Sequence, residues 1–265
     1  MQKPLLYIVK IGGKVVDDEE ALKMLLRHFA QLKTQKVLIH GGGNQVDARL
    51  ERCQIKPVFH HGRRITDKPT LEMVTMVLAG LINKQIVSHL QALKCDAIGL
   101  SGADANLIRA IKRKNTTVDF GFVGDIDRID SRKLSQLLDL KLMPVLCSVT
   151  HDGESQLLNT NADTIASAIA IAMSKTHRVR LLYCFDLPGL LGDVSNQQTL
   201  IPRLDHSAYR DLKDKGHIKG GMLPKLENCF QALQCGVDEV YIGNAEGISN
   251  RLRFGSDATG TTIIL

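Results

Sequence analysis

Hydrophobic positions near the N-terminus follow two different periods. Leu5–Ile11 is a near-continuous apolar run, which is typical of a strand buried on both faces. From Leu22 to Phe29 the apolar residues recur at i, i+3, i+4 and i+7, and this spacing predicts an amphipathic helix that begins near Asp18. Val37–Ile39 predicts a second strand, with a glycine turn and another helix behind it. The alternation of strand and helix predicts a parallel α/β sheet.

The rest of the chain continues this pattern. Helices are predicted over Pro69–Leu93, Ala162–Met173 and Met222–Cys235, and strands over Ala97–Leu100, Pro144–Val149, Val179–Phe185, Glu239–Ile242 and Thr261–Leu265. Leu107–Ile111 and Val118–Val123 flank a basic segment and predict a hairpin with a solvated turn at residues 112–115. An interruption near residue 175 predicts two lobes, residues 1–175 and 176–265.

Composition narrows the function classes. Apolar residues make up 44% of the 265 residues, enough for a sizeable core, and no run approaches the roughly 18 apolar residues of a membrane span. The N-terminus resembles a strand more than a signal peptide, so we expect a cytoplasmic protein with no membrane contact. The net charge of +6 is spread out and aromatic residues are only 4%, which favours small anionic ligands over nucleic acid. The six cysteines include no C-x-x-C pair and predict reduced thiols.

Three glycine-rich segments lie where ligands bind in open α/β sheets, at strand ends or helix starts. Lys10 is costly inside a buried strand unless it reaches water or an anion, and the following Gly12 and Gly13 let a ligand approach the backbone. The alternative is an edge-strand lysine that extends to solvent. His40–Gly43 presents bare amides at a helix N-terminus, which is either an anion site or a tight turn. His40 itself is predicted to be structural.

The third segment, Gly220–Lys225, puts a lysine in a first helical turn, where the helix dipole disfavours it unless an anion is bound or the lysine is simply exposed. Two further segments carry candidate polar groups. Asn161 and Asp163 fit the start of the buried helix, but Asn159 needs another explanation. Arg64 could grip a carboxylate, although a surface arginine is the commoner case. No P-loop motif is present.

Taken together, these segments resemble the amino acid kinase family. The matching motifs are K-I-G-G at 10–13, H-G-G-G at 40–43, G-R-R-I-T at 62–66, N-T-N-A-D at 159–163 and G-G-M-L-P-K at 220–225. Each is weak alone, but the combination spans nearly the whole chain, and the G-R-R-I-T segment favours the acylglutamate branch. The resemblance implies a three-layer α/β/α sandwich with a mainly parallel central sheet. It also implies ATP-dependent phosphorylation of the γ-carboxylate of N-acetyl-L-glutamate, with Mg²⁺ carried by ATP, in arginine biosynthesis.

The resemblance also implies roles for individual residues. Lys10, Lys225 and Asp163 would be catalytic, with the carboxylate orienting both lysines. The N-acylglutamate would be held by Gly42, Gly43, Arg64, Asn159 and Asn161. The nucleotide would be bound by Gly12, Gly13, Asp186, Gly189, Gly220 and Gly221. Residues 1–175 would bind acylglutamate and dimerise, and residues 176–265 would bind the nucleotide.

Some expectations stay open. Phe185 stands where relatives commonly carry Ser or Thr, so the adenosine contacts differ from the family pattern. The paired Arg63 and Arg64 and the basic surplus make N-succinylglutamate an alternative substrate. A non-catalytic nucleotide or amino-acid sensor on the same scaffold is a further alternative. The first strand begins almost at once, so we expect a homodimer that arginine does not inhibit, with the helix over residues 69–93 as the contact.

Overall fold

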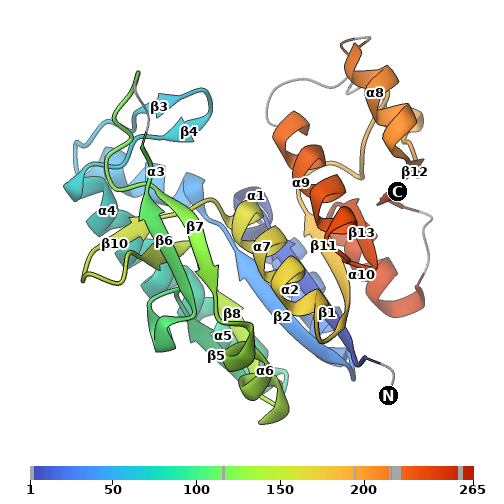
Figure 1. Ribbon diagram of the computed structural model, residues 1–265, viewed down its shortest axis with the longest axis horizontal. Coiled ribbons are helices and arrows are strands. Elements are labelled where there is room, and N and C mark those ends of the chain that lie inside the picture. The colour runs from blue at the N-terminus through green and yellow to red at the C-terminus, as the bar shows by residue number, and fades with distance from the viewer. Residues whose placement is uncertain (1–2, 115–116, 194, 215, 217–221, 256–258) are drawn as a thin grey trace.

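An eight-stranded sheet forms the centre of the protein (Figure 1). The structure is a computed structural model that describes residues 3–114, 117–193, 195–214, 216, 222–255 and 259–265. In spatial order the strands are β12 (Arg203–Leu204), β14 (Thr261–Ile263), β13 (Glu239–Gly243), β11 (Arg178–Cys184), β1 (Leu5–Ile11), β2 (Gln35–His40), β8 (Met143–Leu146) and β5 (Ala97–Leu100). Neighbouring strands run parallel except β13 and β14. The mainly parallel central sheet is therefore confirmed.

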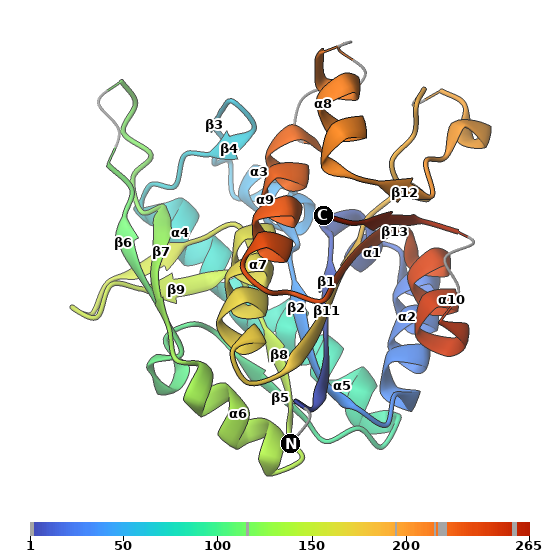
Figure 2. The ribbon, with the colours of Figure 1, turned by 45° about the vertical axis from the view of Figure 1, so that its right-hand side comes forward.

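Helices cover both faces of this sheet (Figure 2). One face packs against α6 (Ser131–Asp139), α7 (Ala162–Ser174) and α9 (Met222–Gln234), and the other against α2 (Glu19–Gln31), α3 (Gly43–Arg52), α5 (Asn83–Ala92) and α10 (Ala245–Phe254). The strand alternation explains the division: Leu6 and Ile8 enter the first core, and Tyr7 and Val9 the second. The three-layer α/β/α sandwich is confirmed. The short helix α1 (Gly13–Asp17) follows β1, and α8 (His206–Asp214) packs on α9 through Tyr209 and Phe230.

A smaller sheet lies beside the main one, with strand order β10 (Leu157–Asn159), β9 (Val149–His151), β6 (Ile108–Lys112) and β7 (Gly124–Ile129). The predicted strand over residues 118–123 is wrong, because the chain there bends through Gly121 at φ +68° and the strand begins only at Gly124. The predicted strand over residues 144–149 is split between β8 and β9, which belong to different sheets. A two-stranded hairpin, β3 (Phe59–His60) and β4 (Arg63–Arg64), lies near β6 and β7 in both ribbon views.

The predicted long helix is present as a continuous segment, Lys68–Ala92, made of α4 (Lys68–Val74), a π-helical stretch η1 (Thr75–Ile82) and α5. Asp67 caps it by accepting a hydrogen bond from the Thr70 amide at 3.0 Å. By length and composition this is the one helix among the described residues that could cross a membrane, and 44% of its most apolar window is buried inside the protein. That is weak evidence for a span, since core helices pass the same test.

The expected boundary near residue 175 falls between α7 and β11. The main sheet continues across it, because β11 pairs with β1 along its whole length, from Leu5 opposite Arg178 to Ile11 opposite Cys184. This pairing brings the ends of β1 and β11 to one edge of the sheet, beside the end of β2.

Candidate active site

Two glycine turns face each other at the carboxyl edge of the sheet. The amides of Gly12 and Gly41 are used within the sheet, donating to Cys184 O and Ile11 O at 3.0 Å each. Gly13 and Gly43 approach so closely that a Cβ on Gly13 would lie 3.5 Å from the Gly43 amide nitrogen. Because Gly43 begins the ten-residue helix α3, its amide is one of the unpaired donors at a helix N-terminus, where an anion is favoured.

Gly42 needs to be glycine for two reasons. Its φ is +145°, a backbone conformation that side chains rarely adopt, and a Cβ there would lie 2.3 Å from Ile82 Cδ1. Ile82 ends the π-helical stretch, so this stretch packs directly on the second glycine turn. The glycine fixes the position of α3 and of its first amides.

Lys10, Asp163 and Lys225 come together from three separate elements. Strand alternation directs Lys10 to the α7 face of the sheet, where Asp163 lies in the first turn of α7. Lys10 Nζ lies 2.7 Å from Asp163 Oδ1, and Lys225 Nζ, from the first turns of α9, lies 3.9 Å from Asp163 Oδ2. The structure thus brings the three predicted catalytic residues into one group.

The electrostatics of this group favour the ionised form of Asp163. Burial alone would raise the pKa of Asp163, but the ammonium groups of Lys10 and Lys225 outweigh it and hold the pKa below its usual value. Lys225 also lies over the ring of Phe185, with Nζ 4.6 Å from the ring centroid. Phe185, which departs from the family pattern, therefore contacts a candidate catalytic lysine.

A cavity of about 290 Å³ opens beside this group. Lys10, Asp163 and the glycines at 13 and 41–43 line one part of it, and Arg64, Asn159 and Asn161 line another. Arg64 is held in place by an ion pair with Asp47, and its Nη2 donates to Gly43 O at 3.3 Å. The predicted substrate-binding residues thus share one cavity with Lys10 and Asp163.

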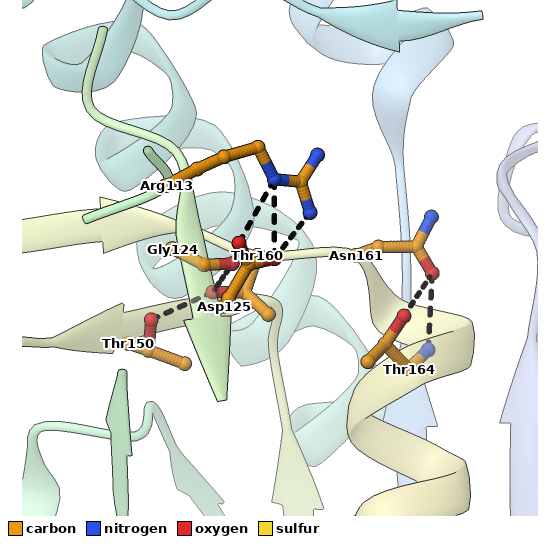
Figure 3. Close-up of polar contacts among 7 residues, drawn as sticks. All are labelled: Arg113, Gly124, Asp125, Thr150, Thr160, Asn161 and Thr164. Carbon is orange, nitrogen blue, oxygen red and sulfur yellow. Dashed lines mark hydrogen bonds and ion pairs between the residues drawn. The ribbon is translucent and has the colours of Figure 1, made fainter. Parts of the chain in front are cut away.

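Polar contacts order the corner between β10 and α7 (Figure 3). Asn161 caps α7 by accepting a hydrogen bond from the Thr164 amide at 3.0 Å. Thr160 is buried and shares a 2.7 Å hydrogen bond with Thr150 of β9. Just before this corner, Asn159 Nδ2 donates to Thr66 Oγ1 at 3.0 Å. These bonds fix the start of α7, and with it the position of Asp163.

The predicted nucleotide-binding residues are distributed more widely. Asp186 pairs with Lys14, a residue that sequence reasoning missed, at 2.5 Å. Both line a separate cavity of about 370 Å³ on the nucleotide side, together with Phe185, Asn244 and Glu246. Gly189 instead packs against Thr261, whose Oγ1 accepts a hydrogen bond from the Leu190 amide at 2.8 Å. Gly220 and Gly221 lie outside the described residues.

His40 lies under the glycine turn, fully buried. Its ring nitrogens contact Asn83 Nδ2 at 3.1 Å and Gly41 O at 2.9 Å. Burial lowers the pKa of His40 to about 4, so the ring is neutral at pH 7. These contacts support the structural role predicted for it.

The site offers few side chains that could bind a metal ion. Across the described part of the chain, no group of three or more His, Cys, Asp and Glu side chains could hold a metal ion. Mg²⁺ usually binds proteins through one or two carboxylates together with substrate phosphates and water. Asp163 pairs with Lys10 and Lys225, and Asp186 pairs with Lys14, so each of these carboxylates already has a lysine partner.

The fold and the site together define an α/β protein that gathers ammonium groups and helix N-terminal amides around a cavity suited to an anion. The chain belongs to the amino acid kinase family, whose model matches residues 6–244. It is 46% identical over 246 residues to an acetylglutamate kinase of Bacteroides fragilis, covering 93% of this chain and 94% of that one.

Solved structures share the fold. The structure of smu.665 from Streptococcus mutans UA159 matches with a TM-score of 0.79 at 25% identity, covering 97% of this chain and 98% of that one. A carbamate kinase from Giardia lamblia bound to AMP-PNP matches with a TM-score of 0.70 at 15% identity, covering 99% of this chain and 98% of that one. At that identity the second match supports the fold alone.

Proposed function

We propose that this protein transfers the γ-phosphoryl group of ATP to the γ-carboxylate of N-acetyl-L-glutamate, a step of arginine biosynthesis. The observation that carries the proposal is the group of Lys10, Asp163 and Lys225 beside a cavity that also contains Arg64 and Asn159. The Bacteroides fragilis relative, an acetylglutamate kinase that aligns over nearly the full length of both chains, supports the same reaction.

The chemistry needs charge stabilisation more than proton transfer. A γ-carboxylate with a pKa of about 4.3 is already ionised at neutral pH, so no general base is required. The obstacle is the approach of one anion to another. Lys10 and Lys225 would stabilise the transferring phosphoryl group, and the amides of Gly13 and Gly43 would donate to its oxygens and to the substrate. Asp163 touches both ammonium groups and would act as a positioning residue.

The acylglutamate would occupy the cavity of about 290 Å³. Arg64 offers a guanidinium, already oriented by Asp47, for the α-carboxylate. Asn159 and Asn161 would add contacts from their side-chain amides. Gly42, which has no side chain, would let the backbone lie close to the acylglutamate. Val46, Leu78 and Val123 provide apolar surface in the same lining for the carbon chain.

The nucleotide would meet this cavity at the two lysines. ATP would supply the phosphoryl group, with Mg²⁺ bound mainly by its phosphates. Lys14 and Asp186, together with Gly12 and Gly13, would border the phosphate chain on the side of residues 176–265. Roles for Gly189, Gly220 and Gly221 in the same lobe come from the motif resemblance alone.

We further propose a homodimer formed through the helical segment Lys68–Ala92. Met76 and Leu81 support this, because they leave 60% and 38% of their surface exposed on an otherwise apolar segment. Light scattering after gel filtration should give the mass of two chains, and Met76→Glu combined with Leu81→Glu should give one. A monomeric wild type would exclude this dimer.

We also propose a cytoplasmic location. The six cysteines are free thiols, which supports a reducing compartment.

Two measurements together test the reaction. Release of ADP is followed by a coupled assay, and hydroxylamine traps the acyl phosphate as a hydroxamate. N-acetyl-L-glutamate with Mg-ATP should give both products in equal amounts. ADP release without hydroxamate would contradict the proposed acceptor, and absence of both would support a non-catalytic sensor.

A further inference from the structure

A second cavity adjoins the proposed acylglutamate site. It measures about 480 Å³ and is lined by His60, His61, Arg63, Arg113, Lys114, Thr117, Phe120 and Asp125. Arg63 and Arg113 also line the cavity that contains Lys10 and Asp163. These two arginines therefore line both cavities and mark the junction between them, where a substrate group that reaches beyond the first cavity would meet them.

Positive side chains outnumber carboxylates at this junction. Arg64 is paired with Asp47, and Arg113 is paired with Asp125 through both its Nε and Nη2 atoms (Figure 3). Arg63 is exposed, and in the part of the chain that the structure describes no ion pair involves it. Lys114 adds another positive charge to the second cavity. The junction thus carries positive charge beyond what its own carboxylate neutralises.

Arg113 is held in place at this junction, because it pairs with Asp125 and lies over the ring of Phe120, 5.5 Å from its centroid. Arg63 lies opposite His60 in the backbone register of the β3–β4 hairpin. A guanidinium that is held in place loses little freedom when it binds a carboxylate. The positioned guanidinium of Arg113 and the exposed charge of Arg63 together form a suitable site for one more anionic group of the substrate.

We propose that the acyl arm of the substrate ends in a carboxylate that binds Arg63 and Arg113, so that the preferred substrate class is N-(carboxyacyl)-L-glutamate, with N-succinyl-L-glutamate as its simplest probe. This inference rests on the proposed function and deepens it. The γ-carboxylate would lie at Lys10, the α-carboxylate at Arg64, and the acyl carboxylate at the junction. An acetyl group carries no charge that these arginines could recognise.

The test compares kcat/KM for three substrates with Mg-ATP: N-acetyl-, N-butanoyl- and N-succinyl-L-glutamate. Butanoyl matches the length of succinyl without its charge. We expect the succinyl substrate to exceed both others by about 10- to 100-fold, the range expected for a charged hydrogen-bonded contact. Arg63→Ala should reduce the ratio of succinyl to acetyl specificity by a similar factor. The matched control Arg128→Ala removes an exposed arginine of β7 and should keep the wild-type ratio.

The outcomes separate this inference from the proposed function. Turnover of the acetyl substrate with equal or weaker turnover of the succinyl substrate would overturn the inference and leave the proposed function standing. Failure of all three substrates would overturn both. Equal use of butanoyl and succinyl would show that the second cavity offers room and no charge recognition, which also contradicts the inference. Circular dichroism of Arg63→Ala confirms that the comparison is made on folded protein.

Discussion

Lys10 Nζ lies 2.7 Å from Asp163 Oδ1, joining the central strand β1 to the first turn of α7. Both side chains are largely buried, with 10% and 20% of their surfaces exposed. An ammonium group in the middle of a parallel sheet is stabilised there by a carboxylate, and the helix dipole favours that carboxylate at the start of α7. In this position the Lys10 side chain also lines the cavity, where its ammonium group can bind an anionic ligand.

Asp163→Asn should separate the positioning role from substrate binding. The change keeps the shape of the side chain but removes the charge that holds Lys10 and Lys225 together. We expect kcat to fall by about 10²- to 10³-fold while KM for acylglutamate changes little, since the proposed role of the lost charge is to hold the two lysines and not to bind the substrate. Asp127→Asn, which breaks an exposed pair with Arg109, is the control and should retain full kcat. A wild-type kcat in Asp163→Asn would remove this carboxylate from the account.

Gly42→Ala should destabilise the protein. The new Cβ would occupy a strained backbone conformation and lie 2.3 Å from Ile82 Cδ1. A strained backbone residue costs about 1–3 kcal/mol, and we expect the free energy of unfolding in urea to fall by that amount. Gly80→Ala is the control, because a Cβ there meets no atom within 4 Å. Equal unfolding free energies for the two variants would show that the π-helical stretch does not restrict Gly42.

His40 should make stability depend on pH. Its pKa is about 4 in the folded protein, because the ring is buried, and about 6.5 in the unfolded chain. Between these values the unfolded chain binds more protons, so the contribution of His40 is complete above pH 6.5 and is lost as the pH falls toward 4, at about 1.4 kcal/mol per pH unit.

His40→Gln tests this dependence by urea unfolding at pH 7 and pH 5. Burial also lowers the pKa of His28 and His177, so only the difference between wild type and variant reports on His40. The variant should be less stable at pH 7 but should lose less stability on acidification. Identical losses on acidification would contradict a neutral buried ring.

The hydrophobic pattern predicted the main sheet because its strands are buried on both faces and read as continuous apolar runs. It failed where local sequence is a poor guide to pairing. Residues 118–123 are apolar enough for a strand, yet Gly121 bridges to Thr66, on another part of the chain, and β7 starts later. The helix over Ser131–Asp139 was not predicted. The sequence does contain its signal, an N-cap residue at Asp130 followed by Leu134 and Leu138, which are four residues apart and buried on one face.

The candidate site was predictable where glycine motifs mark strand ends. The resemblance supplied Lys10, Asp163 and Lys225, and the structure brings them within ion-pair distance. Arg113 was assigned to a solvated turn because it lies in a basic segment between two apolar runs, and its ion pair with Asp125 of β7 could not be read from that pattern. The pair of Lys14 and Asp186 was also missed, since contacts between the ends of neighbouring parallel strands depend on register, which the sequence does not show.

The most direct test of the central claim is kcat for Lys10→Ala and Lys225→Ala at saturating Mg-ATP and acylglutamate. If both ammonium groups stabilise the transferring phosphoryl group, each variant should remain folded by circular dichroism and lose about 10²- to 10³-fold in kcat. Lys213→Ala, which removes an exposed lysine of α8, should keep the wild-type rate. A near-normal kcat in either site variant would contradict the claim for that lysine.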